Sequence, residues 1–73
     1  MNQETVELFE YIATAYKAAG FPPIHSWTFG PNDGDDVTPY RELRAYGLIQ
    51  GFTMGEREWR LTQSGLEKIL TDE

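Results

Sequence analysis

The sequence predicts one small α+β domain over residues 1–73, in the order helix, short irregular segment, helix, β-hairpin, helix. Three observations support this prediction. Apolar residues recur every three or four positions near the start, apolar and charged residues alternate around position 60, and turn-forming or helix-capping residues separate these stretches. A chain of 73 residues supports one hydrophobic core, and its hydrophobic content of 40% is enough to form one.

The first helix is predicted over residues 4–19. Gly20 suits the left-handed position that follows a helix, and Pro22 prevents the helix from continuing. The apolar face of this helix consists of Leu8, Phe9, Ile12, Ala13, Tyr16 and Ala19.

Residues 24–30 allow two interpretations. Trp27 and Phe29 alternate with polar residues, as in a short strand, whereas Ser26 is a residue type that caps a helical turn. The sequence leaves both the strand and the short helix open. Residues 30–36 are rich in Gly, Pro, Asn and Asp, and are predicted to form a turn.

A second helix is predicted over residues 38–46. Thr38 is expected to be its N-cap, Pro39 suits its first position, and Gly47 is expected to end it. Helical spacing gives an inward face of Val37, Tyr40 and Leu43, and an outward face of Thr38, Arg41 and Arg44.

The hairpin is predicted over residues 48–61, with its turn at residues 53–56. The aromatic residues are expected to lie mostly in the core, with Phe52 and Met54 exposed near the hairpin tip. Apolar and charged residues alternate along the returning strand in the order Glu58, Trp59, Arg60 and Leu61.

The last helix is predicted to run from Thr62, its N-cap, to about residue 71. Its apolar positions Leu66, Ile69 and Leu70 are expected to face the core.

The charge is unevenly distributed along the chain. The net charge is −6, of which residues 1–36 carry −5 and residues 67–73 carry −2, whereas residues 37–66 carry +1. Local charge decides which surface attracts a partner, because salt screens exposed charges beyond roughly 8–10 Å. Four of the six basic residues fall in the middle region: Arg41, Arg44, Arg57 and Arg60.

Several classes of chemistry are excluded by the residue types present. The chain has no cysteine and one histidine, His25, so no structural zinc site of the Cys/His kind can form. The acidic turn with Asp33, Asp35 and Asp36 does not match the spacing of a calcium-binding EF-hand loop. Neither a phosphate-binding loop nor a dinucleotide fingerprint is present. We therefore expect a protein that is not an enzyme and uses no metal or cofactor.

The chain is expected to be cytoplasmic. No basic residue precedes Lys17, which argues against an export signal, and no apolar run is long enough to span a membrane.

The second half of the chain resembles the winged helix-turn-helix domains of small bacterial, archaeal and phage regulators. The residues that carry the resemblance are Leu43, Tyr46, the run 47–49, the run 59–62, Gly65 and Leu66. In the first half, residues 20–23 resemble the junction between helices 1 and 2 of repressors of the LexA type. The segment that corresponds to helix 2 departs from the pattern, because it is short, aromatic and poor in helix-forming residues.

The resemblance implies a regulator that binds duplex DNA, acts as a homodimer, and presents helix 38–46 and the 49–61 wing to the duplex. Thr38, Arg41, Glu42 and Arg44 are then the candidates for contacts with bases, and Arg57 and Arg60 for contacts with the phosphate backbone.

The alternative is an acidic winged-helix protein-interaction module, such as a phage-type inhibitor, a DNA mimic or a complex subunit, which binds a basic protein. The net charge, the acidic entry to the second helix and the reduced helix 2 favour this alternative.

Overall fold

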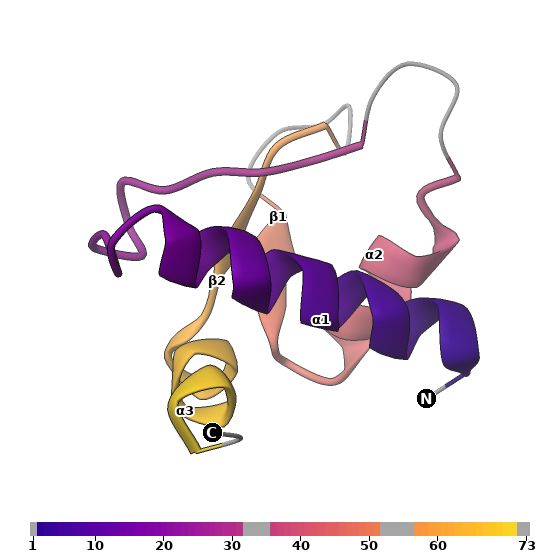
Figure 1. The fold of residues 1–73 in the computed structure, drawn as a ribbon. Coiled ribbons are helices and arrows are strands. Elements are labelled where there is room, and N and C mark those ends of the chain that lie inside the picture. The colour runs from indigo at the N-terminus through magenta and orange to yellow at the C-terminus, as the bar shows by residue number, and fades with distance from the viewer. Residues whose placement is uncertain (1, 32–35, 52–56, 72–73) are drawn as a thin grey trace.

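The computed structural model describes residues 2–31, 36–51 and 57–71. Within these ranges the chain is an α+β fold with the predicted order of elements (Figure 1). The elements are α1 (Gln3–Ala18), α2 (Thr38–Ala45), β1 (Ile49–Gly51), β2 (Trp59–Leu61) and α3 (Gln63–Thr71).

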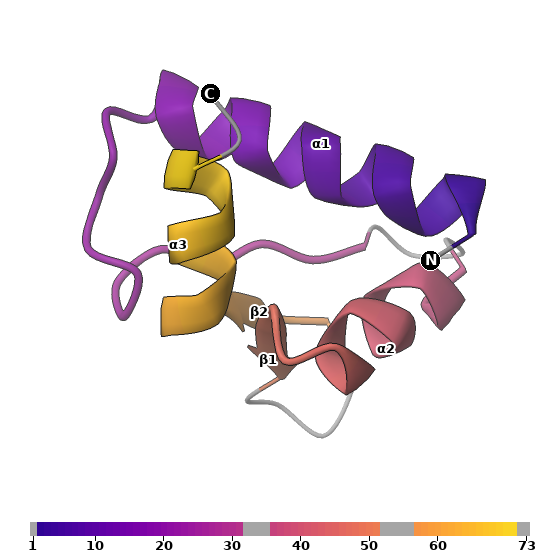
Figure 2. The same cartoon turned by 90° about the horizontal axis from the view of Figure 1, so that it is seen from below.

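The helices and the hairpin form two layers. α1 makes one layer, and α2 lies beside the β1–β2 hairpin in the other, as two perpendicular views show (Figures 1 and 2). α3 packs on β2 near the C-terminal end of α1. One side of α2 packs on α1, and the outer side of α2 and of the hairpin therefore faces away from α1.

The bounds of α1 follow from local capping at both ends. The Thr5 backbone N–H donates to Asn2 Oδ1 at 2.9 Å, so Asn2 is the N-cap. At the other end Gly20 has φ +88°, and its N–H donates to the Lys17 carbonyl at 3.0 Å, while that of Phe21 donates to the Tyr16 carbonyl at 3.3 Å. These two bonds form a Schellman motif, which confirms the predicted helix end.

Residues 24–30 form neither of the two predicted structures. Residues 24–26 form a turn, in which the Ser26 N–H donates to the Pro23 carbonyl at 3.0 Å. Phe29 then forms an isolated antiparallel bridge with Trp59, through hydrogen bonds of 3.0 and 2.7 Å. The bridge does not extend into a strand, because Pro31 has no N–H to donate to it.

The start of α2 corrects one prediction. Thr38 is the first helical residue and not the N-cap, which is Val37, and Val37 provides no side-chain hydrogen bond. The capping oxygen comes from Asp36, whose Oδ1 accepts from the Thr38 N–H at 2.9 Å. Asp36 lies two residues before Thr38, and its side-chain oxygen reaches an N–H of the first turn that the helix itself leaves unpaired.

The hairpin has the predicted alternation of faces. β1 and β2 pair antiparallel, with Ile49 opposite Leu61, Gln50 opposite Arg60 and Gly51 opposite Trp59. The apolar face joins a core of buried residues: Phe9, Ile12, Tyr16, Leu43, Leu48, Ile49, Trp59, Leu61 and Ile69. The predicted turn at residues 53–56, with Phe52 and Met54, lies outside the described residues.

The capping of α3 ties it to the chain before the hairpin. Thr62 Oγ1 accepts from the Gly65 N–H at 3.1 Å and donates to the Gly47 carbonyl, which confirms Thr62 as the cap. Ile69 is buried and Leu66 packs against the core, but Leu70 is 50% exposed and the prediction that it faces inward was wrong. Because Ile69 faces the core, the next residue along the helix, Leu70, points towards the outer side of α3.

Candidate nucleic-acid interface

The outward face of α2 carries the side chains that the sequence placed there. Thr38, Arg41 and Arg44 are exposed, whereas Leu43, on the other side of the helix, is completely buried. The burial of Leu43 therefore determines which side of α2 is exposed to solvent. Arginine on such a face can donate two hydrogen bonds to guanine or to a phosphate.

The half-buried side chain of Glu42 binds the residue that caps α1. One of its carboxylate oxygens accepts from the Asn2 backbone N–H and the other from Asn2 Nδ2, each at 3.1 Å. Both oxygens of Glu42 thus bind the N-cap residue of α1, and this contact joins the beginning of α1 to α2. Sequence reasoning gave no signal for it, because the two residues are 40 positions apart.

Arg44 lies over the ring of Trp59, with its guanidinium carbon 5.6 Å from the ring centroid. This is a cation–π contact. Trp59 is completely buried, and its ring also stacks on Tyr40, with 5.8 Å between centroids. Because Tyr40 and Arg44 are one helical turn apart, they lie on the same side of α2 and together cover the ring of Trp59. The contact restricts where the guanidinium of Arg44 can point.

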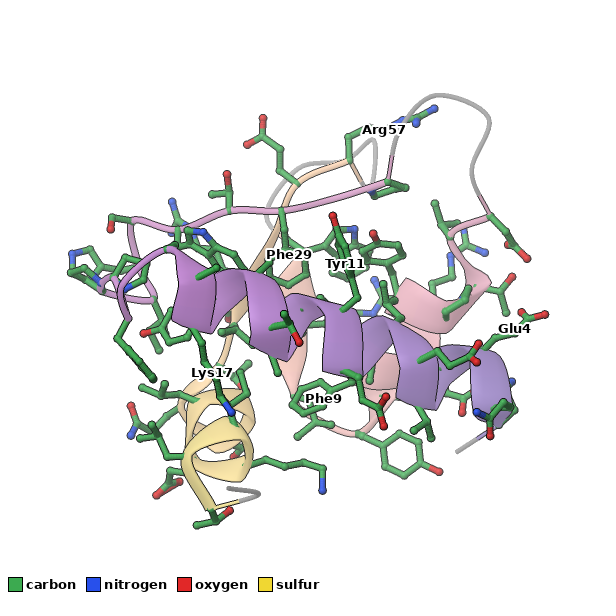
Figure 3. The ribbon with its side chains drawn as sticks, viewed as in Figure 1. Glu4, Phe9, Tyr11, Lys17, Phe29 and Arg57 are labelled. Atoms are coloured by element: carbon green, nitrogen blue, oxygen red, sulfur yellow. The ribbon has the colours of Figure 1, made fainter. Side chains whose placement is uncertain are left out.

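The hairpin carries the other two candidate arginines. Arg60 is half-buried in β2, opposite the exposed Gln50, and alternates with the buried Trp59 and Leu61. Arg57 precedes β2 and is exposed (Figure 3). The outer face of the hairpin is therefore polar, as the alternation predicted.

The two layers carry opposite charges. α2 and the hairpin carry the four arginines, whereas the exposed residues of α1 include three glutamates: Glu4, Glu7 and Glu10. Figure 2 shows α1 on one side of the molecule, and α2 and the hairpin on the other. Among the described residues of this layer, two exposed acidic residues lie close to the arginines along the chain: Asp36, just before α2, and Glu58, just before β2.

The capping role of Asp36 lowers the pKa of its carboxyl group. Hydrogen bonds from the backbone and side chain of Thr38 lower its pKa below the ordinary value of 3.8, and the charge of Arg41 lowers it further. Asp36 is therefore a carboxylate at neutral pH, at the N-terminus of α2, where its charge also interacts favourably with the helix dipole.

The part of the chain that the structure describes offers no metal site and no membrane-spanning helix. No group of three or more His, Asp and Glu side chains comes together in residues 2–31, 36–51 and 57–71. Nor is any helix there both long and apolar enough to cross a bilayer. His25 is exposed in the turn that follows α1.

The candidate site therefore consists of Thr38, Arg41 and Arg44 on α2, with Arg57 and Arg60 on the hairpin. Sequence spacing predicted all five, but the contact of Arg44 with Trp59 had no local signal. No family model, no curated protein and no solved structure matches this chain.

Proposed function

We propose that this protein is a small winged-helix domain that binds duplex DNA through α2 and the hairpin. The observation that supports this most is the separation of charge: the arginines of α2 and the hairpin lie in the layer that faces away from the acidic helix α1. The bridge between Phe29 and Trp59 adds support, because it ties the segment before α2 to the edge of the hairpin.

In this proposal α2 enters the major groove. Its eight residues span about 12 Å, which is close to the width of the groove. Arg41 and Arg44 contact base edges, with guanine as the preferred base, and Thr38 lies at the end of α2 that reads bases. We leave Glu42 out of the proposed base contacts, because each of its oxygens already accepts a hydrogen bond from Asn2.

Arg57 and Arg60 supply contacts with phosphate. Each such contact releases counterions from the duplex, so the affinity depends on salt and not on base sequence. The hairpin thereby positions α2 on the duplex, and the two pairs of arginines have separable roles.

The net charge of −6 is compatible with this proposal. The molecule measures 30 × 26 × 19 Å, so its shortest dimension is about twice the screening length of 8–10 Å at physiological salt. The glutamates of α1 are thus largely screened from a duplex on the opposite layer. They still slow association, because steering responds to the field of the whole molecule.

The test is fluorescence anisotropy with a duplex selected from a random pool, over a series of salt concentrations. Arg41→Ala or Arg44→Ala is expected to cost about 1–3 kcal/mol and to relax the preference at one base position. Arg57→Ala or Arg60→Ala is expected to weaken all sequences equally and to reduce the salt slope by about one. Lys68→Ala, which removes one positive charge from α3, is the control and should change neither property.

A basic protein is the second candidate partner, favoured by the exposed glutamates of α1. It would bind the opposite layer, so Glu4→Lys and Glu7→Lys would abolish its binding while the four arginine variants would retain it. If no duplex is enriched from the random pool, the DNA proposal is wrong.

A further inference from the structure

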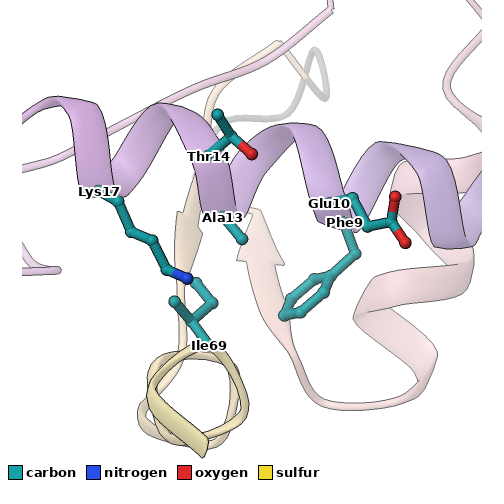
Figure 4. A pocket seen from close by; sticks show the side chains of 6 residues that line it. All are labelled: Phe9, Glu10, Ala13, Thr14, Lys17 and Ile69. Carbon is teal, nitrogen blue, oxygen red and sulfur yellow. The ribbon is translucent and has the colours of Figure 1, made fainter. Parts of the chain in front are cut away.

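A groove runs between α1 and α3, on the molecule's surface. It has a volume of about 480 Å³ and is lined by six residues: Phe9, Glu10, Ala13, Thr14, Lys17 and Ile69 (Figure 4). We propose that this groove is the interface of a symmetric homodimer, in which the α1 helices of two copies pack antiparallel. The proposal does not depend on DNA binding.

The order of charges along the groove selects a second copy as the occupant. Glu10 and Lys17 are seven residues apart, which is about 10.5 Å along the helix. Figure 4 shows them at the two ends of the groove, with Ala13 between them. A two-fold axis midway between the two residues places Glu10 of each copy beside Lys17 of the other. The same two-fold rotation thus forms both Glu10–Lys17 pairs, as an isologous interface requires.

The middle of the groove suits close packing of two helices. Ala13 and Thr14 flank the midpoint between Glu10 and Lys17, and their side chains are short. Helix axes approach to 8–10 Å depending on the side chains between them, and short side chains favour the lower limit. Phe9 and Ile69 line the floor of the groove and are themselves buried in the core, so the surface that a second copy would contact belongs mainly to α1. A purely basic or acidic peptide would match one end of the groove and be repelled at the other.

Charge exchange followed by sedimentation velocity tests the pairing. Glu10→Lys places two positive charges in each groove and Lys17→Glu places two negative charges there, so each variant alone is expected to dissociate at least tenfold more readily than the wild type. A mixture of the two variants should form a heterodimer, because each lysine of one copy then lies beside a glutamate of the other. Glu7→Lys makes the same charge change on α1 outside the groove and should leave dimerisation unchanged.

Disulfide cross-linking is an independent measurement. The chain has no cysteine, so Thr14→Cys introduces a single thiol. Two such thiols would lie next to the two-fold axis and should form a covalent dimer on mild oxidation, whereas those of Glu7→Cys should not. A wild-type chain that stays monomeric at millimolar concentration would overturn the dimer. A mixture of the charge variants that stays monomeric would overturn the Glu10–Lys17 pairing. Neither experiment contains DNA, so failure here is distinct from failure of DNA binding.

Discussion

Thr5 is completely buried at the beginning of α1, yet its hydroxyl has no hydrogen-bond partner among the described residues. An unsatisfied buried hydroxyl costs about 1–3 kcal/mol of desolvation free energy. Thr5→Val keeps the shape of the side chain, and the backbone N–H remains bonded to Asn2. We therefore expect the free energy of unfolding to rise by up to about 1 kcal/mol in urea denaturation. Thr14→Val, at an exposed position of the same helix, should have little effect. A loss of about 1 kcal/mol in Thr5→Val would show that the hydroxyl stabilises the fold.

Gly65 is buried in the first turn of α3, where a Cβ would lie 2.1 Å from the Leu48 carbonyl oxygen. Alanine in place of glycine normally stabilises a helix by about 1 kcal/mol. Here the contact with a backbone atom requires α3 to move away from the segment before β1, and such overpacking costs about 1–3 kcal/mol. Gly65→Ala should therefore lower the thermal midpoint, whereas Ser64→Ala, at the exposed neighbouring position, should not. A raised midpoint in Gly65→Ala would contradict this account of the contact.

At the scale of the element, the stability of α2 should depend on pH through its capping carboxylate. The pKa of Asp36 is lowered in the folded state, chiefly by hydrogen bonds from Thr38. Its contribution is therefore present above the unfolded pKa and is lost as the pH falls through the folded pKa. Asp36→Asn keeps an oxygen that can accept from Thr38 but removes the charge. The difference in thermal midpoint between wild type and Asp36→Asn should be largest near pH 7 and should shrink as the pH falls through the folded pKa of Asp36, which lies below 3.8. An unchanged difference down to pH 2 would exclude this role.

The elements differ in how far their own sequence determines them. α1 was predictable to within one residue at each end, because its capping residues and apolar stripe lie within the helix and next to it. The hairpin alternation was predictable for the same reason. Residues 24–30 were not, because Phe29 takes its conformation from Trp59, thirty positions later. The exposure of Leu70 also escaped prediction, because it depends on how α3 sits on β2.

At the scale of the whole molecule, the candidate site was predictable as a set of side chains but not as a surface. Helical spacing placed Arg41 and Arg44 on one face of α2, and strand alternation placed Arg60 on the outer face of the hairpin. Neither pattern shows that α2 and the hairpin share a layer, or that the glutamates of α1 lie on the opposite one. The attachment of Glu42 to Asn2 likewise arises only when α1 and α2 pack together.

The most direct test of DNA binding by the layer of α2 and the hairpin is an amide NMR titration of the labelled protein with a selected duplex. The predicted result is that chemical-shift changes concentrate in residues 38–45 and 57–61. Amides on the exposed face of α1, at Glu4, Glu7 and Glu10, should remain nearly unchanged. Changes centred on α1, or none with a duplex at millimolar concentration, would contradict the assignment of the DNA-binding surface to α2 and the hairpin.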